Sequence, residues 1–154
     1  MYQGGYLAGR IHKLTGRKIN ELLKANGVKE MNGAQGTILF ALWTNESLTI
    51  KEITKMTGLA KTSLTSMLER MRQADLIGIT DNPEDGRSKL ITLTEKSRKL
   101  RSVYEKISAD MADCWYRGFS EEEILRFEEM LEKVLHNIES FEVANDKDRT
   151  AGTY

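Results

Sequence analysis

The stretch that decides the fold runs from residue 48 to residue 77 and reads LTIKEITKMTGLAKTSLTSMLERMRQADLI. Thr49 and Glu52 have the spacing of a capping box, which predicts the start of a short helix. Gly58 predicts a sharp turn after it, because glycine adopts left-handed backbone conformations readily. A second helix with 3.6-residue periodicity follows, so the stretch has the pattern of a helix-turn-helix. The residues expected on the buried sides are Ile53 and Met56 in the first helix and Leu64, Leu68 and Met71 in the second.

The next stretch, TDNPEDGRSKLITLTEKS at residues 80–97, holds the only proline of the chain. Two segments rich in β-branched and apolar residues, LIGIT at 76–80 and KLITL at 89–93, predict two strands. The dipeptides Asn-Pro and Asp-Gly between them are turn formers, which predicts a hairpin with an extended tip. Arg87 and Lys89 lie at this tip. A helix-turn-helix followed by a hairpin is the pattern of a winged helix-turn-helix, a fold that binds DNA.

Helical periodicity predicts four further helices around this unit. The first runs from about Tyr6 to Asn26 and stops near Gly27. The second follows Asn32 as N-cap, and Gly33 and Gly36 are expected to weaken its first turns by about 1 kcal/mol each. Its inward residues are expected to be Ile38, Leu39, Leu42 and Trp43.

The last two helices are predicted to begin at Thr94 and at the capping box of Ser120 and Glu123, with Gly118 separating them. The inward positions expected in the fifth helix are Leu100, Val103, Ile107, Met111 and Cys114. Cys114 is therefore predicted to be a buried structural thiol. The sequence thus predicts a mostly α fold with a small β wing, made of six helices and a two- to three-stranded wing sheet.

The predicted organisation has four parts along the chain. Residues 1–31 form an N-terminal helix, 32–97 a winged helix-turn-helix domain, 98–141 two C-terminal helices, and 142–154 a disordered tail without apolar spacing. The first helix and the last two have wider apolar faces than a small winged-helix domain needs to cover. Residues 1–31 and 98–141 are therefore expected to form a dimerisation region.

Composition limits the classes of protein that remain. The 154 residues are 40% hydrophobic and 30% charged, which is ordinary for a folded domain and too apolar for disorder. No apolar run approaches the roughly 18 residues that span a bilayer, and the N-terminus lacks the pattern of a signal peptide. The single cysteine cannot form an intrachain disulfide, so we expect a cytoplasmic protein.

The zero net charge conceals an uneven distribution. Residues 49–101 carry 11 Lys or Arg against 7 Asp or Glu, whereas residues 102–154 carry 6 against 13. A basic middle segment can create the local field that attracts a polyanion even in a neutral chain. The residues expected to contact DNA are Thr49, Lys61, Thr62, Ser63, Thr65, Ser66, Arg70, Asp85, Arg87, Ser88 and Lys89. Arg70 and Arg72 have an alternative, because either can pair with Glu69 or Asp75 instead.

These segments resemble the MarR-type winged-helix transcription regulators from about Tyr6 to Phe141. The most specific match is DNPEDGRSKLITLTEKS, which is similar to the family's Asp-x-Arg wing motif and the Leu-Thr start of the next helix. The resemblance places Arg87 as the wing arginine and Asp85 as an acidic partner that orients its guanidinium. Ser66 stands where many members have arginine, and Asp75 stands where glycine is usual before the first wing strand.

The resemblance implies a homodimer that binds double-stranded DNA, acts as a repressor at a palindromic operator, and releases it on binding a small aromatic effector. The residues expected to line an effector pocket are His12, Trp43, Tyr104, Met111 and Trp115. We expect no enzymatic activity, cofactor or metal site, because no nucleophile–base pair, phosphate-binding glycine loop or metal-ligand cluster is present in the sequence. The alternative function is a winged-helix module that contacts proteins and has lost DNA binding.

Overall fold

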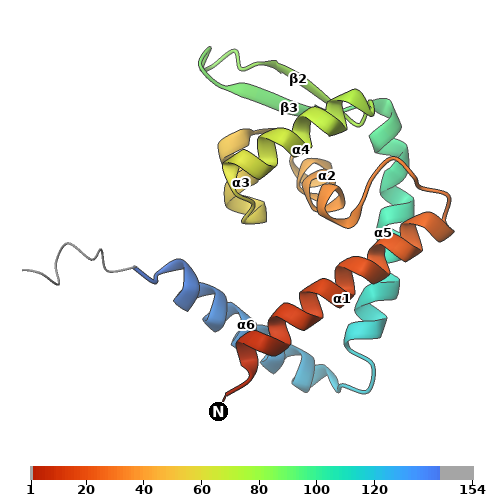
Figure 1. The fold of residues 1–154 in the computed structure, drawn as a ribbon, viewed down its shortest axis with the longest axis vertical. Helices are drawn as coiled ribbons and strands as arrows, with labels where there is room; N and C mark the ends of the chain where they lie inside the picture. The colour runs from red at the N-terminus through yellow and green to blue at the C-terminus, as the bar shows by residue number, and fades with distance from the viewer. Residues whose placement is uncertain (1, 143–154) are drawn as a thin grey trace, which may run out of the picture. The chain divides into compact units, whose positions relative to one another are not determined.

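The computed structural model describes residues 2–142, which divide into two compact units, one ending at Asp113 and the other beginning at Cys114 (Figure 1). The predicted tail lies almost entirely outside the described residues. The elements in chain order are α1 (Gly4–Ala25), α2 (Gly33–Asn45), β1 (Ser47–Thr49), α3 (Ile50–Thr57), α4 (Lys61–Gln73), β2 (Ile77–Asp81), β3 (Lys89–Leu93), α5 (Glu95–Trp115) and α6 (Glu121–Glu139). Six helices and one small sheet confirm the predicted fold class. No helix within the described part of the chain is both long and apolar enough to cross a membrane.

The helix-turn-helix forms where the sequence predicts it. Thr49 accepts a hydrogen bond from the Glu52 N–H, and the Glu52 side chain accepts one from the Thr49 N–H, which completes the capping box of α3. Gly58 ends α3 at φ 68°, in the left-handed region. The helix α4 then buries Leu64, Leu68 and Met71 as predicted.

The wing is a three-stranded antiparallel sheet in the order β1-β3-β2. Ile79 of β2 pairs with Ile91 of β3, and Leu48 of β1 pairs with Ile91 from the other side. The short strand β1 was not located from the sequence, because only three residues separate the end of α2 from the cap of α3. In Figure 1 the hairpin of β2 and β3 extends beyond the helices of the winged-helix unit.

The joint between α4 and β2 depends on Asp75, whose φ of 58° is left-handed. The Asp75 N–H donates to the Arg72 carbonyl at 3.0 Å and the Leu76 N–H to the Met71 carbonyl at 2.9 Å, which is a Schellman motif. The Thr94 hydroxyl donates to the Asp75 carbonyl at 2.7 Å. This turn therefore links the end of α4 to the start of both β2 and α5.

The start of α2 has capping contacts besides its two glycines. Asn32 and Gln35 form a capping box, and the Gly33 N–H donates to the Asn20 Oδ1 at 2.9 Å. Gly36 is buried, and a Cβ atom there would lie 2.4 Å from Cε2 of Tyr104. The absence of a side chain at Gly36 thus allows α5 to approach α2.

The core of the first unit is formed by α2, α3, α4 and the sheet, with contributions from α1 and α5. Trp43 anchors it to α5, because its Nε1 donates to the Ser97 carbonyl at 3.1 Å and its ring lies 5.2 Å from that of Tyr104. Burial raises the pKa of the Tyr104 hydroxyl. The largest completely buried side chains of this core are Leu23, Ile38, Leu39, Leu42, Ile53, Leu64, Met71, Leu76, Ile91 and Ile107.

In the second unit, Ser120 and Glu123 form the predicted capping box of α6. Phe119 contacts both Tyr116 and Phe127, with ring centroids 6.3 and 6.1 Å apart. The Tyr116 hydroxyl donates to the Glu128 carboxylate at 2.6 Å, and this contact raises the pKa of Tyr116. These contacts fix the turn around Gly118, whose φ is 85°.

Two predicted burials are wrong. Met56 is 52% exposed, because the inward side of α3 is formed by Ile53 with the partly buried Ile50 and Thr57. Cys114 is also exposed, because the buried stripe of α5 ends before the last turn of that helix. The description of Cys114 as a buried structural thiol is therefore corrected.

We predict that Gly36→Ala lowers the free energy of unfolding by about 1–3 kcal/mol, because the added methyl group overlaps the Tyr104 ring. Gly86→Ala is the control, since a Cβ there meets nothing within 4 Å. Urea denaturation followed by circular dichroism measures both. Equal stabilities of the two variants would contradict the close approach of α2 and α5.

We predict that Asp75→Gly raises the free energy of unfolding by about 0.5–1 kcal/mol, because glycine relieves the left-handed strain. Ala74→Gly, one residue earlier at φ −81°, should lower it, because glycine there only adds entropy to the unfolded chain. Thermal unfolding of the pair provides the measurement. A lower stability of both variants would show that the turn at residue 75 is unstrained.

Candidate nucleic-acid interface

The exposed face of α4 carries hydrogen-bond donors that the protein itself does not use. Lys61, Thr62, Ser63 and Ser66 are all exposed, and within the described residues none of their side chains has a partner. The Thr65 hydroxyl differs, because it donates to the Lys61 carbonyl at 2.9 Å. A hydroxyl has one proton to donate, so Thr65 is left with acceptor capacity only.

The two arginines of α4 also differ. Arg72 donates to both carboxylate oxygens of Glu69, at 3.1 and 2.7 Å, whereas the Arg70 guanidinium has no partner in the part of the chain described here. The hydrogen-bonded ion pair between Arg72 and Glu69 raises the pKa of Arg72 and lowers the pKa of Glu69. Arg70 is therefore the arginine of α4 that is available to a ligand.

The tip of the wing is shaped by its own side chains. Asn82 Oδ1 accepts from the Glu84 N–H at 3.0 Å, and Asn82 Nδ2 donates to the Ser88 hydroxyl at 2.9 Å. The Ser88 hydroxyl in turn donates to the Asp85 carbonyl at 3.1 Å. Ser88 thus uses its proton inside the turn.

Asp85 has a different role from the predicted one. Its Oδ1 accepts from the backbone N–H of Arg87 at 3.0 Å, so the carboxylate shapes the turn and does not orient the guanidinium. The Arg87 side chain has no partner among residues 2–142. All of its guanidinium donors are consequently free.

Two further predicted contact residues are engaged within the protein. Lys89 forms an ion pair with Asp81, the residue opposite it on β2. The Thr49 hydroxyl donates to the Glu52 carboxylate at 2.7 Å and accepts from the Glu52 N–H. The hydrogen bonds that the Thr49 N–H and the Thr49 hydroxyl donate to the Glu52 carboxylate lower the pKa of Glu52, the one from the N–H most strongly.

A hollow of about 560 Å³ lies between the start of α3, the first residue of α4 and the wing. It brings together Thr49, Lys61, Asp85, Arg87, Ser88 and Lys89. Sequence reasoning missed Lys51, Thr54 and Asn82, which also line it. The sequence shows these three residues only as parts of a helix and a turn. They come together because the wing folds back next to α3.

Within the first unit, the other residues predicted for an effector pocket do not share the hollow that His12 lines. His12 lines a hollow of about 450 Å³ between α1 and α2, together with Asn20 and Thr37. Trp43 lies in the core against Tyr104, and Met111 is partly buried on α5. Trp115 is 38% exposed and belongs to the second unit.

The comparisons with known proteins agree with this geometry. The family model described as "MarR family" matches residues 31–89, from the end of the α1–α2 loop to the first residue of β3. Residues 31–89 of the chain are therefore similar to the MarR family. The matched segment contains α2, α3, α4, β2 and the tip of the wing, which carry the candidate interface.

Individual relatives extend the similarity over most of the chain. The transcriptional repressor IacR of Pseudomonas putida is 24% identical over 135 residues, which cover 88% of this chain and 79% of the relative. A crystal structure of overoxidized AbfR bound to DNA is 26% identical, has a TM-score of 0.69, and covers 88% of this chain and 92% of AbfR. A mutant MarR from E. coli complexed with operator DNA has a TM-score of 0.76 at 23% identity, with 85% and 92% covered, and shows the shared fold.

We predict that Thr49→Ala lowers the free energy of unfolding by about 1 kcal/mol, because Thr49 is the N-cap of α3. Thr62→Ala, on the exposed face of α4, should leave stability within about 0.5 kcal/mol of the original. Chemical denaturation measures both. A stable Thr49→Ala variant would mean that the Thr49 hydroxyl is free for another role.

Proposed function

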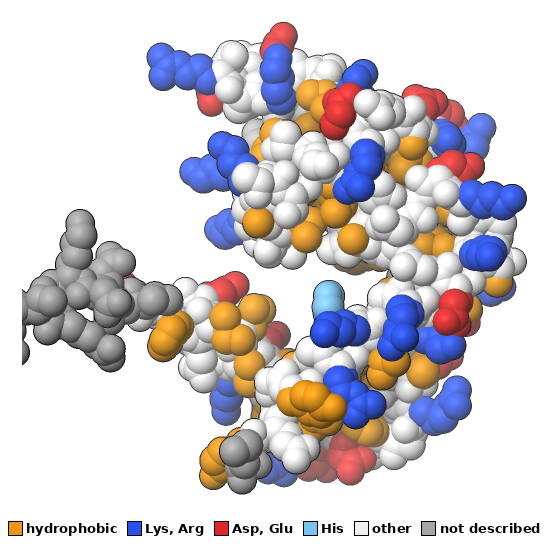
Figure 2. All heavy atoms as spheres, in the orientation of Figure 1, with side chains coloured by type: hydrophobic (Ala, Val, Ile, Leu, Met, Phe, Trp, Pro, Cys, Tyr) orange, Lys and Arg blue, Asp and Glu red, His pale blue; other side chains and the backbone are white. Residues whose placement is uncertain are grey.

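We propose that the protein is a transcription regulator that binds double-stranded DNA through α4 and the wing. The observation that carries this proposal is a set of side-chain donors on α4 and the wing that have no partner in the described residues. They belong to Lys61, Thr62, Ser63, Ser66 and Arg87. Phosphates and base edges present acceptors, so free donors are what a DNA-binding surface must offer. In Figure 2, Lys and Arg side chains project from the winged-helix unit near the wing, with Asp and Glu side chains among them.

The proposed docking follows from the shapes of the two elements. An α-helix fits the major groove, and the small side chains of Thr62, Ser63 and Ser66 allow the backbone of α4 to approach the bases. The hairpin is thin, and Arg87 at its tip is suited to the negative potential of a narrow minor groove. Residues 32–97 are thus proposed to form the DNA-binding domain.

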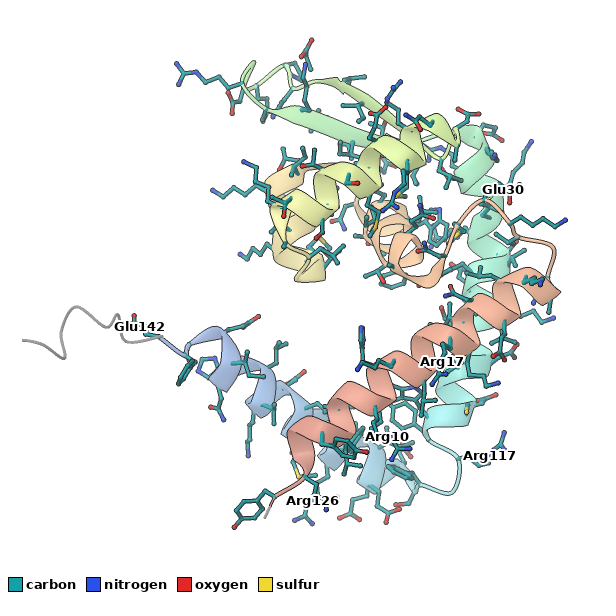
Figure 3. All side chains as sticks on the ribbon, viewed as in Figure 1. Arg10, Arg17, Glu30, Arg117, Arg126 and Glu142 are labelled. Atoms are coloured by element: carbon teal, nitrogen blue, oxygen red, sulfur yellow. The ribbon has the colours of Figure 1, made fainter. Side chains whose placement is uncertain are left out.

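A homodimer is the proposed assembly, with residues 1–31 and 98–141 as its interface. Apolar side chains of α1 and α6 are exposed, among them Leu7, Ile11, Leu14, Leu131 and Ile138. Such stripes require a covering partner in an aqueous environment. Figure 3 shows Arg10 and Arg17 on α1, which carries five Lys or Arg and one Glu, whereas α6 carries seven Glu and two Lys or Arg. Opposite charge of this kind favours association of the two surfaces across a dimer.

A two-fold dimer places the α4 helices of its two protomers about one DNA turn, roughly 34 Å, apart. This spacing suits a palindromic operator. We propose repression of the adjacent gene by occupancy of that operator. A small aromatic effector would release the DNA by changing the distance or angle between the two α4 helices, because a mismatched dimer loses both half-sites together. The hollow lined by His12 is the proposed starting point for locating it.

The test of the proposed function is selection of genomic fragments on the full-length protein, followed by sequencing. We expect an inverted repeat whose half-site centres lie one helical turn apart. Recovery of no duplex, together with capture of a protein partner, would contradict DNA binding and favour the winged-helix interaction module.

We predict that Arg87→Ala weakens binding to the selected duplex by about 1–3 kcal/mol, because a free charged donor at the wing tip is lost. Arg72→Ala is the control, since the Arg72 guanidinium is already paired with Glu69. Gel-shift titrations at a single fixed salt concentration measure both. Unchanged affinity of Arg87→Ala would contradict the role given to the wing.

A further inference from the structure

A small hollow of the first unit lies where the end of α2, the end of β3 and the first turns of α5 meet. Its volume is about 210 Å³, below the roughly 300–1,000 Å³ of sites for drug-sized ligands, so a ligand that fills it must be small. None of its lining residues belongs to α3, α4 or the wing tip, which separates it from the candidate nucleic-acid interface. The lining residues are Leu42, Trp43, Glu46, Leu93, Arg98 and Arg101.

The charges of this hollow that remain unpaired are one cation and one anion. Arg101 is already engaged, because its Nε donates to the Glu105 carboxylate at 2.7 Å and its guanidinium also donates to the Trp43 carbonyl at 3.4 Å. Arg98 and Glu46 form no ion pair within residues 2–142, either with each other or with another group. A simple anion would leave Glu46 uncompensated, and a simple cation would leave Arg98 uncompensated. A ligand that carries both charges complements the hollow.

The backbone of Glu46 supports a role for its side chain beyond the end of α2. Its φ of 58° and ψ of −47° lie outside the left-handed helical region, in a conformation that residues with a Cβ rarely adopt. Glycine adopts such a conformation without the steric penalty. Strained positions of this kind cluster at ligand sites, where the side chain has a use that outweighs the strain. The strain at Glu46 therefore points to a ligand for its carboxylate.

Apolar side chains supply the rest of the hollow. Leu42 and Trp43 belong to the core, and Leu93 at the end of β3 is also buried. Arg98 and Arg101 are three positions apart, so they lie on the same side of α5. The hollow thus combines a carboxylate, guanidinium groups on one helix side and an apolar lining.

We propose that this hollow binds a small zwitterion of the α-amino acid type. Arg98 receives the carboxylate, beside the N–H groups of Arg101 that its two partners leave unused. Glu46 receives the ammonium group, and the carbon skeleton lies against Leu42 and Trp43. The bound ligand would connect the end of α2 to α5. The site differs in place and in ligand class from the aromatic effector proposed above, and it does not depend on DNA binding.

The first experiment titrates the full chain with glycine and with L-valine at constant ionic strength and follows the amide NMR signals. Saturable shifts should appear at Glu46, Leu93 and Arg98. Isovalerate lacks the amino group of L-valine and isobutylamine lacks its carboxylate, so each should bind about tenfold more weakly through the loss of one charge-assisted contact. Absence of saturable shifts with both amino acids would overturn the proposal. Binding of isovalerate or isobutylamine as tight as that of L-valine would overturn it too.

The second experiment measures L-valine binding by variants of the two unpaired residues. Arg98→Gln should weaken binding about tenfold. Lys99→Gln is the control and should leave binding unchanged, because Lys99 is the next residue of α5 and does not line the hollow. Equal affinities of these two variants would contradict the role given to Arg98.

Glu46→Gly distinguishes a ligand-binding glutamate from a structural one. It should raise the melting temperature of the ligand-free protein, because glycine relieves the strained φ, and it should abolish L-valine binding. A folded Glu46→Gly variant that still binds L-valine as the original protein does would overturn the proposal. Because none of these experiments contains DNA, their failure is separate from failure of the proposed function.

Discussion

The left-handed turn at Asp75 is the constraint on which the rest of the winged-helix unit depends. One residue at φ 58° reverses the chain from α4 into β2, and its carbonyl accepts the hydroxyl of Thr94 at the start of α5. Lys96 reinforces the joint by donating to the Ala74 carbonyl at 2.9 Å. The helix α4, the wing and α5 are therefore connected at one point.

Hydrogen bonds that shape the winged-helix unit explain why some polar side chains of the candidate interface are free and others are not. Thr49, Thr65 and Ser88 donate their protons to a cap, a helix turn and the wing turn. Each such bond satisfies a group that shapes the surface. The hydroxyls of Thr62 and Ser66 have no hydrogen-bond partner within the described residues, so they are free to bind a ligand. The interface is thus built from two groups of hydroxyls, one structural and one exposed for contact.

Local rules were sufficient for most of the fold. The capping boxes at Thr49 and Ser120, the stop at Gly58 and the place of the wing follow from short-range chemistry and are confirmed. The left-handed turn at residue 75 was expected, because Asp75 stands where the resembled family usually has glycine. Met56 and Cys114 were misplaced because 3.6-residue spacing does not reveal where a buried stripe ends. Lys51 was missed because it lines the hollow together with a hairpin that lies more than 30 residues away in sequence.

The most direct test of the account is an amide NMR map of the protein titrated with its selected duplex. The account predicts that the largest shifts fall on the first two turns of α4 and on the wing tip around Arg87, and that they appear together at one stoichiometry. Shifts confined to α1 and α6, with the signals of Ser63 and Arg87 unchanged, would contradict it.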